Sequence, residues 1–305
     1  MKEASFVAID LKFNSARPIV IGGATASGKS ALALQIARDH GGVVVNADAL
    51  QVWSCWRVLS ARPSAEESAQ APHLLYGHIT PGADYSVGHW LREVSQIVEE
   101  WRAGDGARPI IVGGTGLYLS ALTQGLAQIP PTPAAIRDAG DKLRHEDGHN
   151  AMFAQLDAPT AARVDRANPM RVQRAWEVLQ ATGRGLAAWQ DDTPPPLLPL
   201  TECDALVIEA QRDWLAQRID HRFDLMLEGG ALEEVRAVQP MWDSSALWAK
   251  AIGAPELIDY LQGSCDLAQA RSRAQAASRQ YAKRQRTWFR SRMSTWHKIM
   301  RPDQE

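Results

Sequence analysis

The chain has 305 residues, of which 45% are hydrophobic and 22% are charged, and its formal net charge is −2. This composition is typical of a globular protein with a substantial core and excludes a disordered or fibrous chain. No apolar run approaches the roughly 18 to 20 residues of a membrane-spanning helix, so we expect no membrane partner.

Apolar strands and helices alternate in the first part of the chain. Residues 18–21, 42–46 and 109–112 form short apolar runs that predict strands, and residues 30–40 and 85–103 have helical periodicity. Continuous apolar strands between helices indicate a parallel sheet covered on both faces. We therefore predict an α/β fold in which a parallel sheet is flanked by helices. Ligands of such sheets bind at the carboxyl ends of the strands.

Two proline clusters divide the rest of the chain, at residues 130–133 and 194–199. Proline ends regular elements and stiffens connections, so these clusters are plausible domain borders. The segment between them is charged, amphipathic and helical in pattern. We predict a core formed by residues 1–128 and 201–305, and a smaller helical insertion domain at residues 129–200.

After the second proline cluster, residues 205–208 predict a further strand of the core, followed by helices that end in a long basic one. Ten Lys or Arg residues and no Asp or Glu lie between Arg271 and Arg301. A basic stretch of this kind is either a solvated helix face or a surface that binds nucleic acid. Charge alone leaves both interpretations open.

The first strand leads directly into a glycine-rich loop with the spacing G-x-x-x-x-G-K-S. In loops of this pattern the backbone N–H groups converge on phosphate oxygens, Lys29 adds a mobile positive charge, and the Ser30 hydroxyl can ligate Mg²⁺. Because a strand precedes the loop and a helix follows it, we predict a phosphate site rather than an ordinary glycine turn. The predicted fold class is therefore α/β, with a P-loop NTPase-like parallel sheet flanked by helices. The loop consists of Gly23, Ala24, Thr25, Ala26, Ser27, Gly28, Lys29 and Ser30.

The loop alone does not identify the reaction, and a kinase or NTPase would be the usual assumption. The strand at residues 109–112 ends in Gly113, Gly114 and Thr115, without the carboxylate that such enzymes use to orient metal and water. Asp48 is the one well-placed acid in the loops that follow the three strands. It could hold a metal, accept a proton from a nucleophile or cap a turn.

These motifs resemble those of the tRNA dimethylallyltransferase family, also called the IPP transferase family, in its bacterial form. The resemblance spans nearly the whole chain in the same order, although Ala49 stands where the family usually has serine. Besides the phosphate loop, it rests on residues 46–53, 113–118, 171–178, 251–253 and 280–288.

The resemblance implies transfer of a dimethylallyl group from dimethylallyl diphosphate to a tRNA, with release of pyrophosphate. The acceptor would be N6 of the adenine 3′ to the anticodon, position 37, in tRNAs that read codons beginning with U. The phosphate loop then binds the diphosphate together with Mg²⁺, with Ser30 as the metal ligand. The family's general base falls on Asp48, its diphosphate-contacting threonine on Thr115, and an arginine that reaches the diphosphate on Arg222.

The same resemblance implies contacts with the tRNA anticodon stem-loop. The modified adenine has to leave its stack, so residues beside the general base are expected to read it, and Gln51 is a candidate. Lys and Arg residues of the basic helix would meet backbone phosphates. The implied contacts are Asp48, Ala49, Leu50, Gln51, Arg137, Met170, Arg171, Val172, Gln173, Arg174, Lys283 and Arg284.

Three other functions fit parts of the sequence. An adenylate isopentenyltransferase acting on free AMP, ADP or ATP would need neither the insertion nor the basic end. A small-molecule kinase is favoured by the phosphate loop alone, and a non-catalytic RNA-binding module by the basic helix alone. The three cysteines, Cys55, Cys203 and Cys265, suggest neither a disulfide framework nor a zinc site. We expect a cytoplasmic monomer.

Overall fold

The structure is a computed structural model that describes residues 17–300. The chain forms two compact units. Unit 1 contains the chain up to Thr123 and again from Leu198, and unit 2 contains Gln124–Leu197. The borders between the units therefore precede those expected from the prolines by a few residues.

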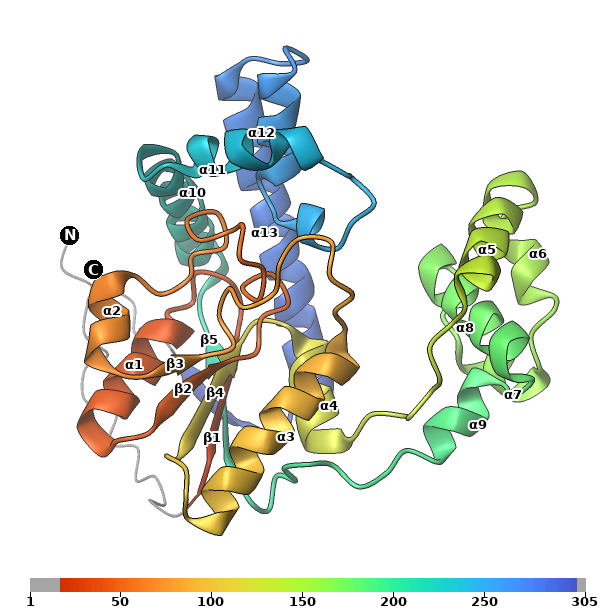
Figure 1. Cartoon of the computed structure of the whole chain (residues 1–305), viewed down its shortest axis with the longest axis horizontal. Coiled ribbons are helices and arrows are strands. Elements are labelled where there is room, and N and C mark those ends of the chain that lie inside the picture. The colour runs from red at the N-terminus through yellow and green to blue at the C-terminus, as the bar shows by residue number, and fades with distance from the viewer. Residues whose placement is uncertain (1–16, 301–305) are drawn as a thin grey trace. The chain divides into compact units, whose positions relative to one another are not determined.

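Unit 1 is built on a six-stranded sheet with the order β3-β2-β4-β1-β5-β6, in which every neighbouring pair is parallel. The central strands are fully buried apolar runs, as expected for a sheet covered on both faces. This arrangement confirms the predicted α/β fold (Figure 1). The strands are β1 Ile19–Gly23, β2 Val43–Asn46, β3 His73–Leu74, β4 Pro109–Gly113, β5 Asp204–Glu209 and β6 His297–Met300.

The helices of unit 1 follow the strands in chain order. In its first part they are α1 Lys29–His40, α2 Ala65–Gln70, α3 Val87–Ala103 and α4 Gly116–Gln124. After β5 come α10 Arg212–Glu228, α11 Ala231–Val238, α12 Ala254–Leu261 and the long α13 Leu267–Arg292, with short 3-10 turns at Gln239–Met241 and Trp248–Lys250. These four helices gather beyond the carboxyl ends of the strands (Figure 1).

Alternation along β1 sends its side chains to opposite faces of the sheet. Ile21 packs with Leu32 of α1 on one face. On the other face, a Cβ built on Gly22 would lie 3.0 Å from the Phe289 ring of α13 and 3.3 Å from Leu119 of α4. Glycine at this position lets both helices approach the sheet closely, and α13 thereby reaches the edge where the site loops lie.

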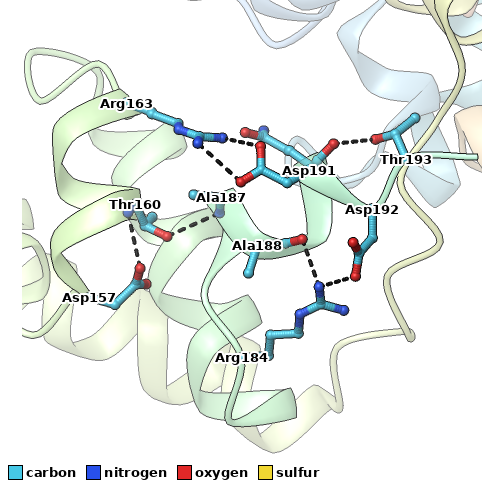
Figure 2. A network of polar contacts seen from close by, with 10 residues as sticks. Asp157, Thr160, Arg163, Arg184, Ala187, Ala188, Asp191, Asp192 and Thr193 are labelled. Carbon is cyan, nitrogen blue, oxygen red and sulfur yellow. Dashed lines mark hydrogen bonds and ion pairs between the residues drawn. The ribbon is translucent and has the colours of Figure 1, made fainter.

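Unit 2 consists of helices around a small apolar core of Met152, Val172 and Trp176. Polar contacts join its helices: Arg163 donates two hydrogen bonds to Asp191, at 2.6 and 3.0 Å, and Thr160 accepts one from the Ala187 amide at 3.1 Å (Figure 2). The helices are α5 Ala134–Glu146, α6 His149–Phe153, α7 Ala158–Arg163, α8 Pro169–Thr182 and α9 Leu186–Asp191.

The basic stretch at the end of the chain differs from the single basic helix that its composition suggested. Helix α13 ends at Arg292, and Lys298 belongs to β6, which pairs with β5 at the sheet edge. Arg301 lies outside the described residues. All three cysteines carry free thiols. In the part of the chain from residue 17 to 300, no helix has the length and apolar character to cross a bilayer.

Candidate active site

The predicted phosphate loop joins β1 to α1 at the carboxyl edge of the sheet. Gly28 is left-handed, with φ of 93°, and this conformation, which favours glycine, turns the chain into the first turn of α1. The unpaired N–H groups at the start of the helix and its dipole favour an anion here. The side chain of Ser30 is exposed, whereas Ser27 is buried and its hydroxyl has no partner within residues 17–300.

Two cations lie beside this loop. Burial lowers the pKa of Lys29 to about 8, against the opposing effect of the Asp48 carboxylate, and the Arg222 charge lowers it further. Burial also lowers the pKa of Arg222 to about 10. The Arg222 guanidinium, on α10, donates a hydrogen bond to the Thr25 hydroxyl of the loop. Both side chains are half-buried, so a multiply charged anion here would meet two poorly hydrated positive charges.

Asp48 follows β2 and is held by Asn46, the last residue of that strand. The Asn46 side chain accepts a hydrogen bond from the Asp48 amide at 2.9 Å and donates one to the Asp48 carbonyl oxygen at 3.0 Å. The Trp90 indole donates to the Asn46 carbonyl oxygen at 2.7 Å. Oδ1 of Asp48 accepts from the Leu50 amide at 3.0 Å. The carboxylate therefore has a fixed direction, and among residues 17–300 no side chain or amide hydrogen-bonds its Oδ2, which can face a ligand.

Thr115 lies in the loop after β4, close to the Asp48 loop. Its hydroxyl accepts a hydrogen bond from the Ala49 amide at 2.9 Å. Tyr281, on α13, lies close enough to Asp48 and Thr115 for both to influence its pKa. Burial raises the pKa of Tyr281, and the negative charge of Asp48 raises it further, so this tyrosine stays a neutral phenol. The loops after β1, β2 and β4 thus meet at one edge of the sheet, as parallel strand topology requires.

A pocket of about 50 Å³ lies at this edge. Its polar and charged lining residues are Thr25, Asp48, Ser60, Arg222, Ser278 and Tyr281. Its apolar lining residues are Leu50, Leu59, Ile219, Phe223, Met226 and Ile252. The lining therefore offers both a cation for an anionic group and apolar side chains for a short hydrocarbon.

Gln51 lies three residues after Asp48, and its side chain is hydrogen-bonded to the backbone of residues 60 and 61. Its Nε2 donates to the carbonyl oxygens of Ser60 and Ala61, both at 2.9 Å. Only its Oε1 is left to accept a hydrogen bond from a base. The predicted base-reading role of Gln51 stays a prediction, restricted to that acceptor.

The predicted RNA contacts of unit 2 divide into exposed and buried side chains. Met170 is 61% exposed, and Arg137 and Arg171 are also exposed. Val172 is fully buried in the unit's core. Gln173 is buried as well and accepts a 2.7 Å hydrogen bond from Arg144. Side chains enclosed in the core cannot meet an external RNA, so the expectation narrows to the exposed residues.

Arg174 and the basic residues of α13 are partly engaged within the protein. Arg174 donates to Thr132 at 2.6 Å. In α13, Arg271 pairs with Asp224, Arg273 with Asp259 and Arg279 with Asp220. These pairs leave less free charge on the first half of the helix than the sequence suggested. The Arg284 guanidinium lies 5.6 Å from the centre of the Tyr281 ring, and Lys283 is exposed.

A metal ion at this site would have few protein ligands. Within residues 17–300, no group of three or more His, Cys, Asp or Glu side chains could hold a metal. Mg²⁺ commonly binds through one or two protein oxygens together with phosphate oxygens and waters. The exposed Ser30 hydroxyl at the start of α1 suits that mode.

The sequence did not assign roles to Asn46, Tyr281 or Gln285, although the structure brings all three to this site. Asn46 orients the Asp48 loop, and Tyr281 lines the pocket. Gln285 contacts both glycine-rich loops. Tyr281 and Gln285 stand one turn apart on α13, a spacing that marks a shared helix face once the helix is known.

The parallel sheet, the phosphate loop after its first strand and a pocket lined by Arg222 and by apolar side chains define a P-loop-type transferase class. Within that class, the IPP transferase family model matches residues 51–292, and an isopentenyl transferase model matches residues 17–76. The chain belongs to the IPP transferase family.

Individual relatives agree with this assignment. A tRNA dimethylallyltransferase of Cereibacter sphaeroides strain KD131 is 61% identical over 288 residues, which is 94% of this chain and 90% of that protein. The structure of a tRNA isopentenylpyrophosphate transferase from Bacillus halodurans has 28% identity and a TM-score of 0.66, over 94% of this chain and 91% of that one. A eukaryotic dimethylallyltransferase acting on tRNA has 25% identity and a TM-score of 0.77, over 94% and 74%.

Proposed function

We propose that this protein transfers a dimethylallyl group from dimethylallyl diphosphate to N6 of the adenine 3′ to the anticodon, position 37, in tRNAs that read codons beginning with U. The observation that carries the proposal is the pocket whose lining combines Arg222, Thr25 of the phosphate loop and Asp48 with apolar side chains. Such a pocket accommodates an anionic leaving group, a short hydrocarbon and a proton acceptor together.

The residues around the phosphate loop stabilise the leaving group. In the reaction, the adenine N6 lone pair forms a bond to C1 of the dimethylallyl group, the C1–O bond breaks, and its electron pair leaves with pyrophosphate. Lys29, Arg222 and the N–H groups at the start of α1 hold the charge that develops on the diphosphate oxygens. Mg²⁺, held by Ser30, supplies further positive charge to the diphosphate when bound.

Asp48 accepts the proton that N6 loses. An exocyclic amine is a weak nucleophile, and a carboxylate within hydrogen-bond reach accelerates its attack. Asn46 and the Leu50 amide fix the Asp48 loop and one carboxylate oxygen, so the other oxygen can face the amine. Thr115 holds the Ala49 amide and keeps its hydroxyl hydrogen for a neighbouring acceptor such as a diphosphate oxygen.

Unit 2 and the end of α13 bind the RNA backbone. Arg137 and Lys283 are exposed and form no ion pair within residues 17–300. Phosphate contacts of this kind raise affinity for RNA without specifying a base. The protein's monomeric state and cytoplasmic location stay predictions, and three free thiols suit a reducing compartment.

The test is a labelled-transfer assay in which purified protein is given radiolabelled dimethylallyl diphosphate, Mg²⁺ and either an anticodon stem-loop with adenine at position 37 or free AMP. We expect label in the stem-loop and not in AMP. A stem-loop with guanine at position 37 is the matched control and should stay unlabelled. Label in AMP but not in RNA would instead assign the chain to the adenylate isopentenyltransferases.

A further inference from the structure

Gln285 of α13 joins the two glycine-rich loops of the site. Its Oε1 accepts a 2.8 Å hydrogen bond from the Thr25 amide in the phosphate loop, and its Nε2 donates a 2.8 Å hydrogen bond to the Gly114 carbonyl oxygen. The side chain is only 5% exposed. A buried amide with both ends paired has one defined orientation, because turning it over would place donor against donor and acceptor against acceptor.

The loop after β4 is shaped for this contact. A Cβ built on Gly114 would stand 2.3 Å from Nε2 of Gln285 and 3.2 Å from Oδ2 of Asp48. Glycine therefore allows the amide to reach the loop and leaves room beside the carboxylate. One turn earlier on α13, Tyr281 lines the pocket together with Thr25 and Asp48. A single helix face thus contacts the phosphate loop and the Thr115 loop.

We propose that Gln285 is a positioning residue that fixes the spacing between the phosphate loop and the loop of Gly114 and Thr115. It thereby sets the place of the donor diphosphate relative to Asp48. This inference rests on the proposed function. It also assigns the Thr25 amide to Gln285 rather than to the ligand, so the later amides of the loop hold the diphosphate.

The test compares Gln285→Met with Gln275→Met in the full-length protein. Methionine keeps the length of glutamine and removes both hydrogen bonds. Gln275 is a matched control because it is also buried on α13, where it donates to the Asp220 carbonyl oxygen at 3.1 Å and to Asp224 at 3.0 Å, away from both loops. Each variant is measured for melting temperature, for the Kd of pyrophosphate with Mg²⁺, for the Kd of the stem-loop and for single-turnover transfer.

We expect Gln285→Met to slow single-turnover transfer about 100-fold, since misplacement of reacting groups by about 1 Å has an effect of that size. Its pyrophosphate Kd should rise about tenfold, while its stem-loop Kd should stay within about twofold of wild type. Gln275→Met should match it in melting temperature and keep wild-type transfer. A folded Gln285→Met protein with wild-type transfer and pyrophosphate binding, or an equal loss in both variants, would overturn the proposal.

Gln285→Glu separates the two hydrogen bonds. A carboxylate oxygen can still accept from Thr25, but a carboxylate cannot donate to Gly114. Because the carboxylate also adds a negative charge beside the phosphate loop, pyrophosphate affinity should fall at least as far as in Gln285→Met, and transfer should be slowed at least to a similar extent. Pyrophosphate binding and transfer at wild-type levels would contradict the proposed role. The pyrophosphate measurement needs no prenyl transfer, so a wild-type protein that binds pyrophosphate but modifies no RNA refutes the proposed function and leaves the Gln285 comparison interpretable.

Discussion

The Thr115 hydroxyl accepts a 2.9 Å hydrogen bond from the backbone amide of Ala49, the residue that directly follows Asp48. This contact ties the loop after β4 to the loop after β2. The position of the proposed general base therefore depends on a side chain that lies 67 residues further along the chain, from Asp48 to Thr115. Thr115 can act both on the diphosphate and on the placement of Asp48.

Replacement of Thr115 tests this double role. Thr115→Val keeps the shape of the side chain but removes the acceptor for the Ala49 amide and the hydroxyl hydrogen. Loss of one preorganised donor commonly lowers kcat by about 10² to 10³. We expect a decrease of that order, and Thr115→Ser should restore most of the activity. The measurement is the steady-state rate of transfer. Equal rates for Thr115→Val and Thr115→Ser would contradict the proposed role of the Thr115 hydroxyl.

Asp48→Asn tests the proposed base. Asparagine retains an oxygen to accept from the Leu50 amide, so the loop should keep its conformation. It cannot accept the N6 proton, and loss of general base catalysis lowers rates by about 10² to 10⁴. Single-turnover transfer should fall within that range, with the Kd of the stem-loop little changed. Undiminished transfer would remove Asp48 from this role.

The lowered pKa of Lys29 predicts that the affinity for pyrophosphate depends on pH. Its pKa is about 8 because it is buried, and a bound anion favours its charged form. Below that pH the lysine is already protonated. Above it, binding has to take up a proton, so affinity should fall by up to about tenfold per pH unit. Calorimetry in two buffers of different ionisation enthalpy measures this uptake.

Lys29→Met is the control for that measurement. Methionine does not titrate, so the variant should bind pyrophosphate more weakly and lose the part of the proton uptake that belongs to Lys29. If wild type and variant show the same uptake at pH 9, the titrating group is another one, such as the ligand itself.

Arg137 and Arg163 form a matched pair for RNA binding by unit 2. Both are exposed, but Arg163 makes two hydrogen bonds to Asp191 (Figure 2), whereas Arg137 has no ion pair within residues 17–300. Arg137→Ala should weaken stem-loop binding and reduce the slope of log K against log salt by about 1. Arg163→Ala should leave the slope unchanged. Equal slopes for both variants would exclude an Arg137 phosphate contact.

Features that depend on neighbouring residues in the chain could be predicted from the sequence. The phosphate loop, the strand before it, the helix after it and the helical insertion between the two proline clusters follow from local periodicity and from glycine and proline placement. Strand β3 has only two residues, and β6 interrupts a basic stretch with one buried side chain, Ile299. Both become strands because they pair with β2 and β5, a tertiary effect that no local pattern carries.

The site was predictable to the extent that its residues belong to local motifs. The contact between Gln285 and Thr25 spans 260 positions, and no spacing rule indicates it. The ion pairs of Arg271, Arg273 and Arg279 were hidden for the same reason, because their acidic partners lie on α10 and α12. From the composition alone these arginines would be taken as free positive charges, whereas in the folded protein each forms an ion pair with an aspartate.

Labelled transfer to matched anticodon stem-loops tests the central claim most directly. With Mg²⁺ and labelled dimethylallyl diphosphate, the protein should place the label on N6 of adenine 37 in a stem-loop that reads codons beginning with U, and release pyrophosphate in equal amount. Absence of label from that RNA, together with label in free AMP or with hydrolysis of ATP, would contradict it.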